Sequence, residues 1–173
     1  MLVKANKAFP LSGNNVQIIT DFNSMSDQLL KDIAAAKHHI NMLFFKFEDD
    51  AVGRKIADAL KEKAKEGVQV RLIYDDAGNM MVPRRFYKKL KDNAIQVRPF
   101  IRIFLPLLSR DYNCRNHRKV VVIDGRIGYM GGMNIAQRYA EGLKWGIWRD
   151  THLRITGPAV SELQTSFLTD WRF

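Results

Sequence analysis

The sequence predicts an α/β fold in which a mixed, largely parallel β-sheet is flanked by helices on both faces. Three apolar, strand-like runs lie at residues 16–20, 39–47 and 68–74. They alternate with two stretches, at 25–37 and 52–64, whose apolar residues recur at helical spacing. Strands that alternate with amphipathic helices are typical of βαβ units, in which successive strands pair in parallel.

The rest of the chain continues this alternation in shorter elements. The run Val120–Ile123 consists of branched apolar residues only, which is typical of a strand buried on both faces. The other predicted elements, in order, are a short basic helix that Pro83 starts, a strand at 95–97, a helix at 135–139, a strand at 149–156 and a closing helix after Gly157 and Pro158. Because we find no internal repeat and no low-complexity linker, we expect a single domain over residues 1–173.

Composition limits the classes of protein to which the chain can belong. Of its 173 residues 46% are apolar, which is enough to fill a core. The single cysteine, Cys114, excludes an intramolecular disulfide framework, and no cysteine spacing of the zinc-binding type is present. No window approaches the ~20 apolar residues of a membrane span, and the N-terminus does not resemble a signal peptide. Any contact of this chain with a membrane is therefore expected to be peripheral.

The charge of the chain predicts a polyanionic partner. It carries 28 basic and 18 acidic residues, for a formal net charge of +10. A field of this sign raises the local concentration of phosphate groups and steers them to the surface. Nucleic acid and an anionic membrane surface both fit this description.

The residues that can carry chemistry concentrate around the buried strand. His117 and Lys119 precede it two positions apart, so their side chains point to the same side. His117 can act as a nucleophile on a phosphodiester, since imidazole is neutral near pH 7 and forms a labile phosphoryl–nitrogen bond. Lys119 and the amide of Asn134 can hold phosphoryl oxygens. Gly131 and Gly132 allow close approach of the backbone to a phosphate and can offer N–H donors.

Other polar residues are more ambiguous. Asp124 follows the strand that Lys119 precedes, so we expect a structural role or a role toward a facing segment. Asp75 and Asp76 follow the strand at 68–74, where α/β sheets bind ligands, although turn and capping roles fit them equally well. The histidines outside the motif and Cys114 are interpreted as core or surface residues; these histidines are His38, His39 and His152.

An apolar segment at residues 100–108 lies shortly before His117 and is broken by Pro106. One interpretation is a loop that enters a membrane, with arginines at the headgroups. The apolar contacts would come from Phe104, Leu105, Leu107 and Leu108, and the headgroup contacts from Arg102 and Arg110. The alternative is a hairpin that is buried in the core or against a partner.

The spacing of the motif resembles the signature of the phospholipase D superfamily. His117, Lys119 and Asp124 match its His-x-Lys-x₄-Asp pattern, and Gly131, Gly132 and Asn134 match the Gly-Gly-x-Asn that follows. The chain also resembles the first catalytic half of bacterial cardiolipin synthases in several further segments. These segments are Gly67-Val68-x-Val70-Arg71, Tyr74-Asp75-x-x-Gly78, Trp148-Arg149-Asp150-x-His152, Gly157-Pro158-Ala159-Val160 and Phe167-x-x-Asp170-Trp171.

This resemblance implies a phospholipase D-like fold and a reaction that joins two phosphatidylglycerol molecules into cardiolipin and glycerol, with neither metal nor cofactor. His117 would form the phosphohistidine, with Lys119 and Asp124 in the catalytic motif and Asn134 holding the phosphate. The implied location is peripheral, at the cytoplasmic face of the bacterial cell membrane.

Enzymes of this family pair two motifs in one active site, and this sequence has one. It is therefore expected to be half of a longer or split protein, or a homodimer in which two copies of His117 face each other across a twofold axis. The general acid would be a second histidine from outside the chain. Two alternatives remain: a metal-independent phosphodiesterase that cleaves nucleic acid, and a non-catalytic half that serves assembly or membrane docking.

Overall fold

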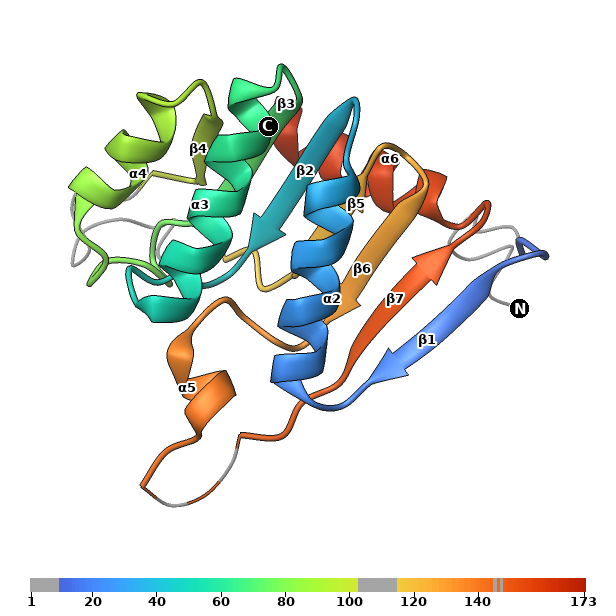
Figure 1. Cartoon of the computed structure of the whole chain (residues 1–173), viewed down its shortest axis with the longest axis horizontal. Helices are drawn as coiled ribbons and strands as arrows, with labels where there is room; N and C mark the ends of the chain where they lie inside the picture. Colours follow the sequence, from blue (N-terminus) through green and yellow to red (C-terminus); the bar gives the residue numbers. More distant parts are fainter. Residues whose placement is uncertain (1–9, 103–114, 145, 147) are drawn as a thin grey trace.

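A seven-stranded mixed sheet forms the centre of the computed structural model (Figure 1), which describes residues 10–102, 115–144, 146 and 148–173. The strand order across the sheet is β1-β7-β6-β5-β2-β3-β4. The strands are β1 (Asn15–Ile19), β2 (His39–Phe44), β3 (Gln69–Asp75), β4 (Gln96–Phe100), β5 (Val120–Ile123), β6 (Ile127–Gly131) and β7 (His152–Thr156).

The directions of the strands confirm a mixed sheet but not a largely parallel one. β2, β3 and β4 pair in parallel, as the alternation of strands and helices predicts. β5 pairs antiparallel with β2, and the pairings β5–β6, β6–β7 and β1–β7 are also antiparallel. A tight turn at Asp124 and Gly125, both with positive φ, returns the chain directly into β6 and so makes the β5–β6 pair antiparallel. β6 itself was not among the strands that the sequence predicted.

Helices cover both faces of the sheet, as expected. Figure 1 shows α2 and α3 in front of the sheet and α6 behind it. The helices are α2 (Phe22–Ala35), α3 (Ala51–Lys65), α4 (Arg84–Lys91), α5 (Gln137–Glu141) and α6 (Val160–Arg172). Val121 belongs to the apolar cluster beneath α2 and α3, whereas Val122 belongs to the cluster beneath α6. β5 is therefore buried on both faces, which confirms the prediction from its branched apolar residues.

Two caps define where the long helices begin. The carboxylate of Asp21 accepts a hydrogen bond from the N–H of Ser24 at the start of α2, and that of Asp50 accepts one from Gly53 at the start of α3. α3 ends two residues before Gly67, which has a positive φ. The boundaries predicted for these helices are correct to within about three residues, which is usual for helix ends.

Most of the apolar segment before His117 lies outside the described residues. Phe104, Leu105, Leu107, Leu108 and Arg110 fall in the range 103–114, and their contact with a membrane stays a prediction. Arg102 is described and is exposed. Among the described residues, no helix combines the length and the apolar character needed to cross a membrane.

Candidate active site

One edge of the sheet brings together the residues that the motif predicts. β2 and β3 end at this edge, while β5 begins there, with Val120 opposite Leu43. β6 also ends there and β7 begins there, with Gly131 opposite His152. His117 and Lys119 immediately precede β5 and therefore lie where the ends of five strands converge.

The His117 imidazole contacts a lysine and an aromatic ring. Lys119 Nζ lies 3.2 Å from Nδ1 and 3.1 Å from Nε2 of His117, and it donates a hydrogen bond of 2.7 Å to the His117 carbonyl. The centroid of the Phe45 ring lies 4.6 Å from that of the imidazole and 5.4 Å from Lys119 Nζ. His117 is exposed, whereas Lys119 is only 2% exposed. The imidazole is thus open to a substrate, while the lysine beside it is almost fully buried.

The surroundings favour a neutral imidazole beside a lysine of lowered pKa. Desolvation, followed by the charge of Lys119, lowers the pKa of His117, and the carboxylates of Asp75 and Asp150 oppose this shift. Burial lowers the pKa of Lys119 to about 8, again opposed by Asp150. At neutral pH the nucleophile candidate is therefore unprotonated, and the lysine next to it still carries its charge.

A network of hydrogen bonds, in part buried, fixes the backbone around His117. The two oxygens of Asp75 accept hydrogen bonds from the N–H groups of Gly78, at 2.8 Å, and Asn116, at 2.9 Å. The Asn116 side chain donates to Asp170 of α6 at 2.9 Å, and Arg118 Nη2 lies 2.7 Å from the other oxygen of the same carboxylate. Asp75 therefore has the turn role that the sequence left open, and through Asn116 it also holds the segment that carries the imidazole.

Asn134 is buried and tied to the protein. Its Oδ1 accepts a hydrogen bond of 3.0 Å from the N–H of Lys46, and its Nδ2 donates one of 2.8 Å to the Tyr139 hydroxyl. An amide NH₂ has two donors, so one remains for a phosphoryl oxygen. The contact of Asn134 with a phosphate stays a prediction. The two hydrogen bonds fix the orientation of the Asn134 side chain.

Gly131 and Gly132 are needed for packing within the chain. A Cβ at Gly131 would overlap Thr151 and His152, and one at Gly132 would overlap the carboxylate of Asp150. The N–H of Gly132 donates to the Thr151 carbonyl at 2.9 Å, so the expectation that it is free for a phosphate is wrong. Glycine is needed here because the segment that enters β7 passes so closely over the end of β6.

Asp124 lies away from this site. Its carboxylate accepts three hydrogen bonds of 2.8 Å, from the N–H groups of Lys37, His38 and His39. Partial burial raises its pKa, but these three donors outweigh burial and the net pKa is lowered. The length of β5, roughly 16 Å at 3.3 Å per residue, separates Asp124 from Lys119. These contacts favour the structural role that the spacing indicated, and the catalytic role of Asp124 stays a prediction.

Two residues near the site were not among the predicted site residues. His152 is fully buried, which agrees with its interpretation as a core or surface residue. Neither of its ring nitrogens has a hydrogen-bond partner among the described residues. Burial lowers its pKa to about 4, with Lys119 contributing and Asp150 opposing. Asp150 approaches Gly132 and influences the pKa of His117 and of Lys119. The only sequence signal for this pair is the Trp-Arg-Asp-x-His segment.

The described parts of the chain contain no group of three or more His, Cys, Asp or Glu side chains placed to hold a metal ion. The site is therefore built from an exposed imidazole, a buried lysine, a buried amide and two nearby carboxylates. Such a set can attack a phosphoryl group and stabilise the charge that develops on it.

The fold is shared with solved proteins of the phospholipase D class. Nuc from Salmonella typhimurium, a phospholipase D family member, superimposes with a TM-score of 0.70 at 19% identity, over 92% of this chain and 95% of that one. At this level of identity the likeness establishes the fold, and it confirms the expected phospholipase D-like architecture.

The sequence comparison is more specific. The chain belongs to the family described as cardiolipin synthase, phospholipase D-like domain, whose model matches residues 29–171. It is 43% identical over 173 residues to the major cardiolipin synthase of Bacillus subtilis, which covers 99% of this chain and 36% of that protein. It is also 43% identical over 171 residues to cardiolipin synthase 1 of Staphylococcus aureus, covering 99% and 35%. The chain thus spans about a third of the length of the curated relatives it matches.

Proposed function

We propose that the chain forms one half of a phosphatidyl-transfer site that acts on anionic phospholipid, with phosphatidylglycerol as both donor and acceptor. The observation that carries this proposal is the 43% identity to cardiolipin synthases over 99% of the chain. The geometry supports it, because the exposed His117 lies against Lys119 at an edge where the ends of five strands meet.

The reaction starts from the neutral imidazole. A ring nitrogen of His117 attacks the phosphorus of the donor lipid, and the bond from phosphorus to the departing glycerol oxygen breaks. The leaving alkoxide takes a proton from a general acid outside the chain, so that glycerol leaves and a phosphohistidine remains. The hydroxyl of a second phosphatidylglycerol then attacks this phosphorus and gives its proton to the same outside group, which now acts as the base. The phosphorus–nitrogen bond breaks, which releases the free imidazole and gives cardiolipin. Lys119 and Asn134 stabilise the charge on the phosphoryl oxygens in both steps.

A second motif completes this site. Among the described residues the chain supplies one exposed imidazole beside Lys119, and the mechanism needs an acid on the opposite side of the phosphorus. The missing half would come from a further part of a longer protein, from a separate chain or from a second copy of this chain. The reaction would take place at the cytoplasmic face of the bacterial cell membrane.

The substrate class is tested by a direct competition. The chain, alone and mixed with a second-half protein from a cardiolipin synthase, is incubated in EDTA with phosphatidylglycerol vesicles or with single-stranded DNA, and the mass of the assembly is measured. We expect cardiolipin and glycerol from the vesicles and intact DNA. Cleaved DNA together with unchanged lipid would contradict the proposal. It would favour the second candidate, a homodimeric metal-independent nuclease, which the net charge of +10 supports.

Turnover should fall as the pH rises above about 8. The pKa of Lys119 is lowered to about 8, so its stabilising charge is present below that pH and is lost above it. We expect a roughly tenfold decrease in kcat/KM per pH unit beyond this point. Lys119→Arg should be slower but should lose this alkaline decrease, because a guanidinium stays charged. A pH–rate profile that is flat from about 7.5 to 9.5 would contradict a charge role for Lys119.

A further inference from the structure

A turn with two exposed methionines lies at the edge of the sheet that carries the site. Met80 and Met81, in the connection between β3 and α4, are 51% and 95% exposed. Met81 thus presents nearly its whole apolar side chain to water, which is unfavourable unless a partner covers it. Thioether side chains are flexible and adapt to irregular apolar surroundings such as acyl chains.

The helix that follows this turn carries five cations in eight residues. Phe86, Tyr87 and Leu90 are buried against the sheet, and the remaining positions, Arg84, Arg85, Lys88, Lys89 and Lys91, are all exposed and basic. Among the residues that the structure describes, Lys88 alone of these five forms an ion pair, with Asp92 at 2.8 Å. The outer face of α4 therefore presents an excess of positive charge.

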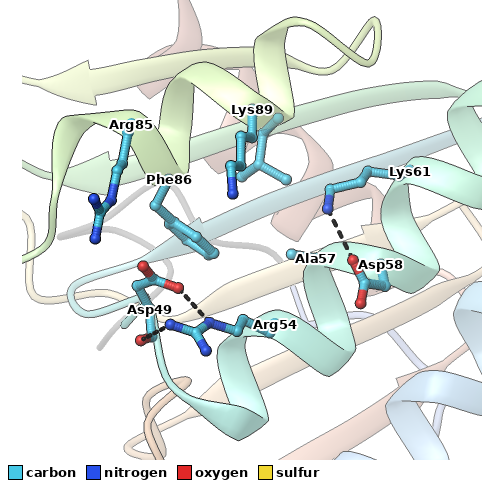
Figure 2. Close-up of a pocket in the computed structure, with 9 residues that line it drawn as sticks. Asp49, Arg54, Ala57, Asp58, Lys61, Arg85, Phe86 and Lys89 are labelled. Atoms are coloured by element: carbon cyan, nitrogen blue, oxygen red, sulfur yellow. Dashed lines mark hydrogen bonds and ion pairs between the residues drawn. The ribbon is translucent and has the colours of Figure 1, made fainter.

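Two of these cations border a groove between α3 and α4 (Figure 2), a cavity of about 420 Å³. Figure 2 shows Arg85 and Lys89 extending from α4, and Arg54 and Lys61 reaching from α3. Both acids of the groove already pair with cations of α3: Asp49, which precedes the N-cap, with Arg54 at 2.6 Å, and Asp58 with Lys61 at 2.8 Å. Since those acids are neutralised, Arg85 and Lys89 leave the groove with a net positive charge that suits a phosphate headgroup.

The turn is linked to the candidate active site through the segment that follows β2. A second cavity of about 420 Å³ is lined by Met80 and Met81 together with Lys46. The N–H of Lys46 donates to Asn134, and the neighbouring Phe45 contacts the His117 imidazole. A surface that held the methionines in place would therefore lie close to the imidazole.

We propose that Met80 and Met81, with the basic face of α4, form a docking surface for an anionic phospholipid bilayer, in which the methionines enter the acyl layer and the cations meet headgroup phosphates. The proposal rests on the proposed function for its choice of a bilayer as partner. Nucleic acid would bind the cations, but its phosphate backbone offers no apolar surface to cover the exposed methionines. The methionines therefore favour lipid. This surface contains no residue of the apolar segment at 100–108.

Vesicle binding tests the proposal without any need for turnover. In a His117→Ala background, sedimentation with vesicles of phosphatidylcholine containing phosphatidylglycerol is compared for three double variants. Arg85→Glu/Lys89→Glu should bind about 100-fold more weakly at low salt. Met80→Ser/Met81→Ser should bind about tenfold more weakly, and this deficit should persist at about 0.5 M salt, where the charge variant and the parent converge. Lys31→Glu/Arg126→Glu, an equal charge change at exposed positions on α2 and in the β5–β6 turn, should bind nearly as well as the parent.

The outcomes separate this proposal from the proposed function. If the first two variants bind as the parent does, or if the Lys31/Arg126 control loses as much affinity as the α4 variant, the docking surface is refuted. Loss of single-stranded DNA binding in the α4 variant, with no parent binding to vesicles, also refutes it. If the docking variants lose vesicle binding while the chain with His117 intact, mixed with the second-half protein, shows no turnover even of short-chain, monomeric phosphatidylglycerol, the proposed function fails and the docking surface stands. The urea midpoint of each variant verifies that it is folded.

Discussion

His117→Ala is expected to reduce phosphodiester turnover by at least about 10³-fold while changing the urea midpoint little. The side chain is exposed, so its removal leaves no buried cavity and costs only the contacts with Phe45 and Lys119. Its chemistry has no substitute within the motif, because no other ring nitrogen of the described residues is both exposed and beside Lys119. The measurement is the initial rate of cardiolipin formation from phosphatidylglycerol in the completed assembly.

The matched control is His38→Ala, which removes an exposed imidazole at the other end of the sheet. Its rate should stay within about twofold of the parent, since surface changes of this kind are usually neutral. A covalent test complements the rate: brief mixing with ³²P-labelled lipid followed by denaturation should trap acid-labile label on the parent and none on His117→Ala. Label of equal amount on both proteins would remove His117 from the role of nucleophile.

The local elements of the fold could be predicted because their signals are local. The branched run at Val120–Ile123 and the helical spacing of Met25, Leu29 and Ile33 each identify one element. The direction in which strands pair could not be predicted in the same way. β2 has a parallel neighbour on one side and an antiparallel neighbour on the other, and no signal within β2 distinguishes them. β6 could not be predicted because Gly128 and Gly131 interrupt its apolar pattern. A side chain at Gly128 would meet Leu163, and one at Gly131 would meet Thr151 and His152, which approach from elsewhere in the chain.

In the candidate site, too, only the contacts within one segment could be predicted. The spacing of His117 and Lys119 places both side chains together, and the contact between them is observed. Asp150 and His152 come more than 30 residues later and reach the site only because β7 pairs with β6, with His152 opposite Gly131. No periodicity within one element reports such a contact. Their part in the site became evident from the pairing of the strands.

Asp124→Ala is expected to destabilise the chain by about 3 kcal/mol, the largest stability change that we predict for the motif. The change leaves the N–H groups of Lys37, His38 and His39 without their acceptor, and these groups lead the chain into the central strand β2. It also places alanine at a φ of 52°, which aspartate and asparagine tolerate better than other residues. Asp124→Asn, which keeps one acceptor oxygen and the backbone preference, should lose about half as much. Asp58→Ala, at an exposed ion pair, should change stability by less than about 0.5 kcal/mol.

The stability lost in Asp124→Ala should depend on pH, and the direction of this dependence identifies the ionised carboxylate as its cause. The pKa of Asp124 is lowered in the folded chain, so the carboxylate stabilises the fold fully above the unfolded pKa of about 3.9 and loses this contribution as pH falls through the lower, folded value. The difference in urea stability between parent and Asp124→Ala should therefore shrink below about pH 4. Turnover per folded molecule should fall less than about tenfold, because Asp124 and the imidazole lie at opposite ends of β5. A loss of turnover comparable to that of His117→Ala, without loss of stability, would return Asp124 to the catalytic set.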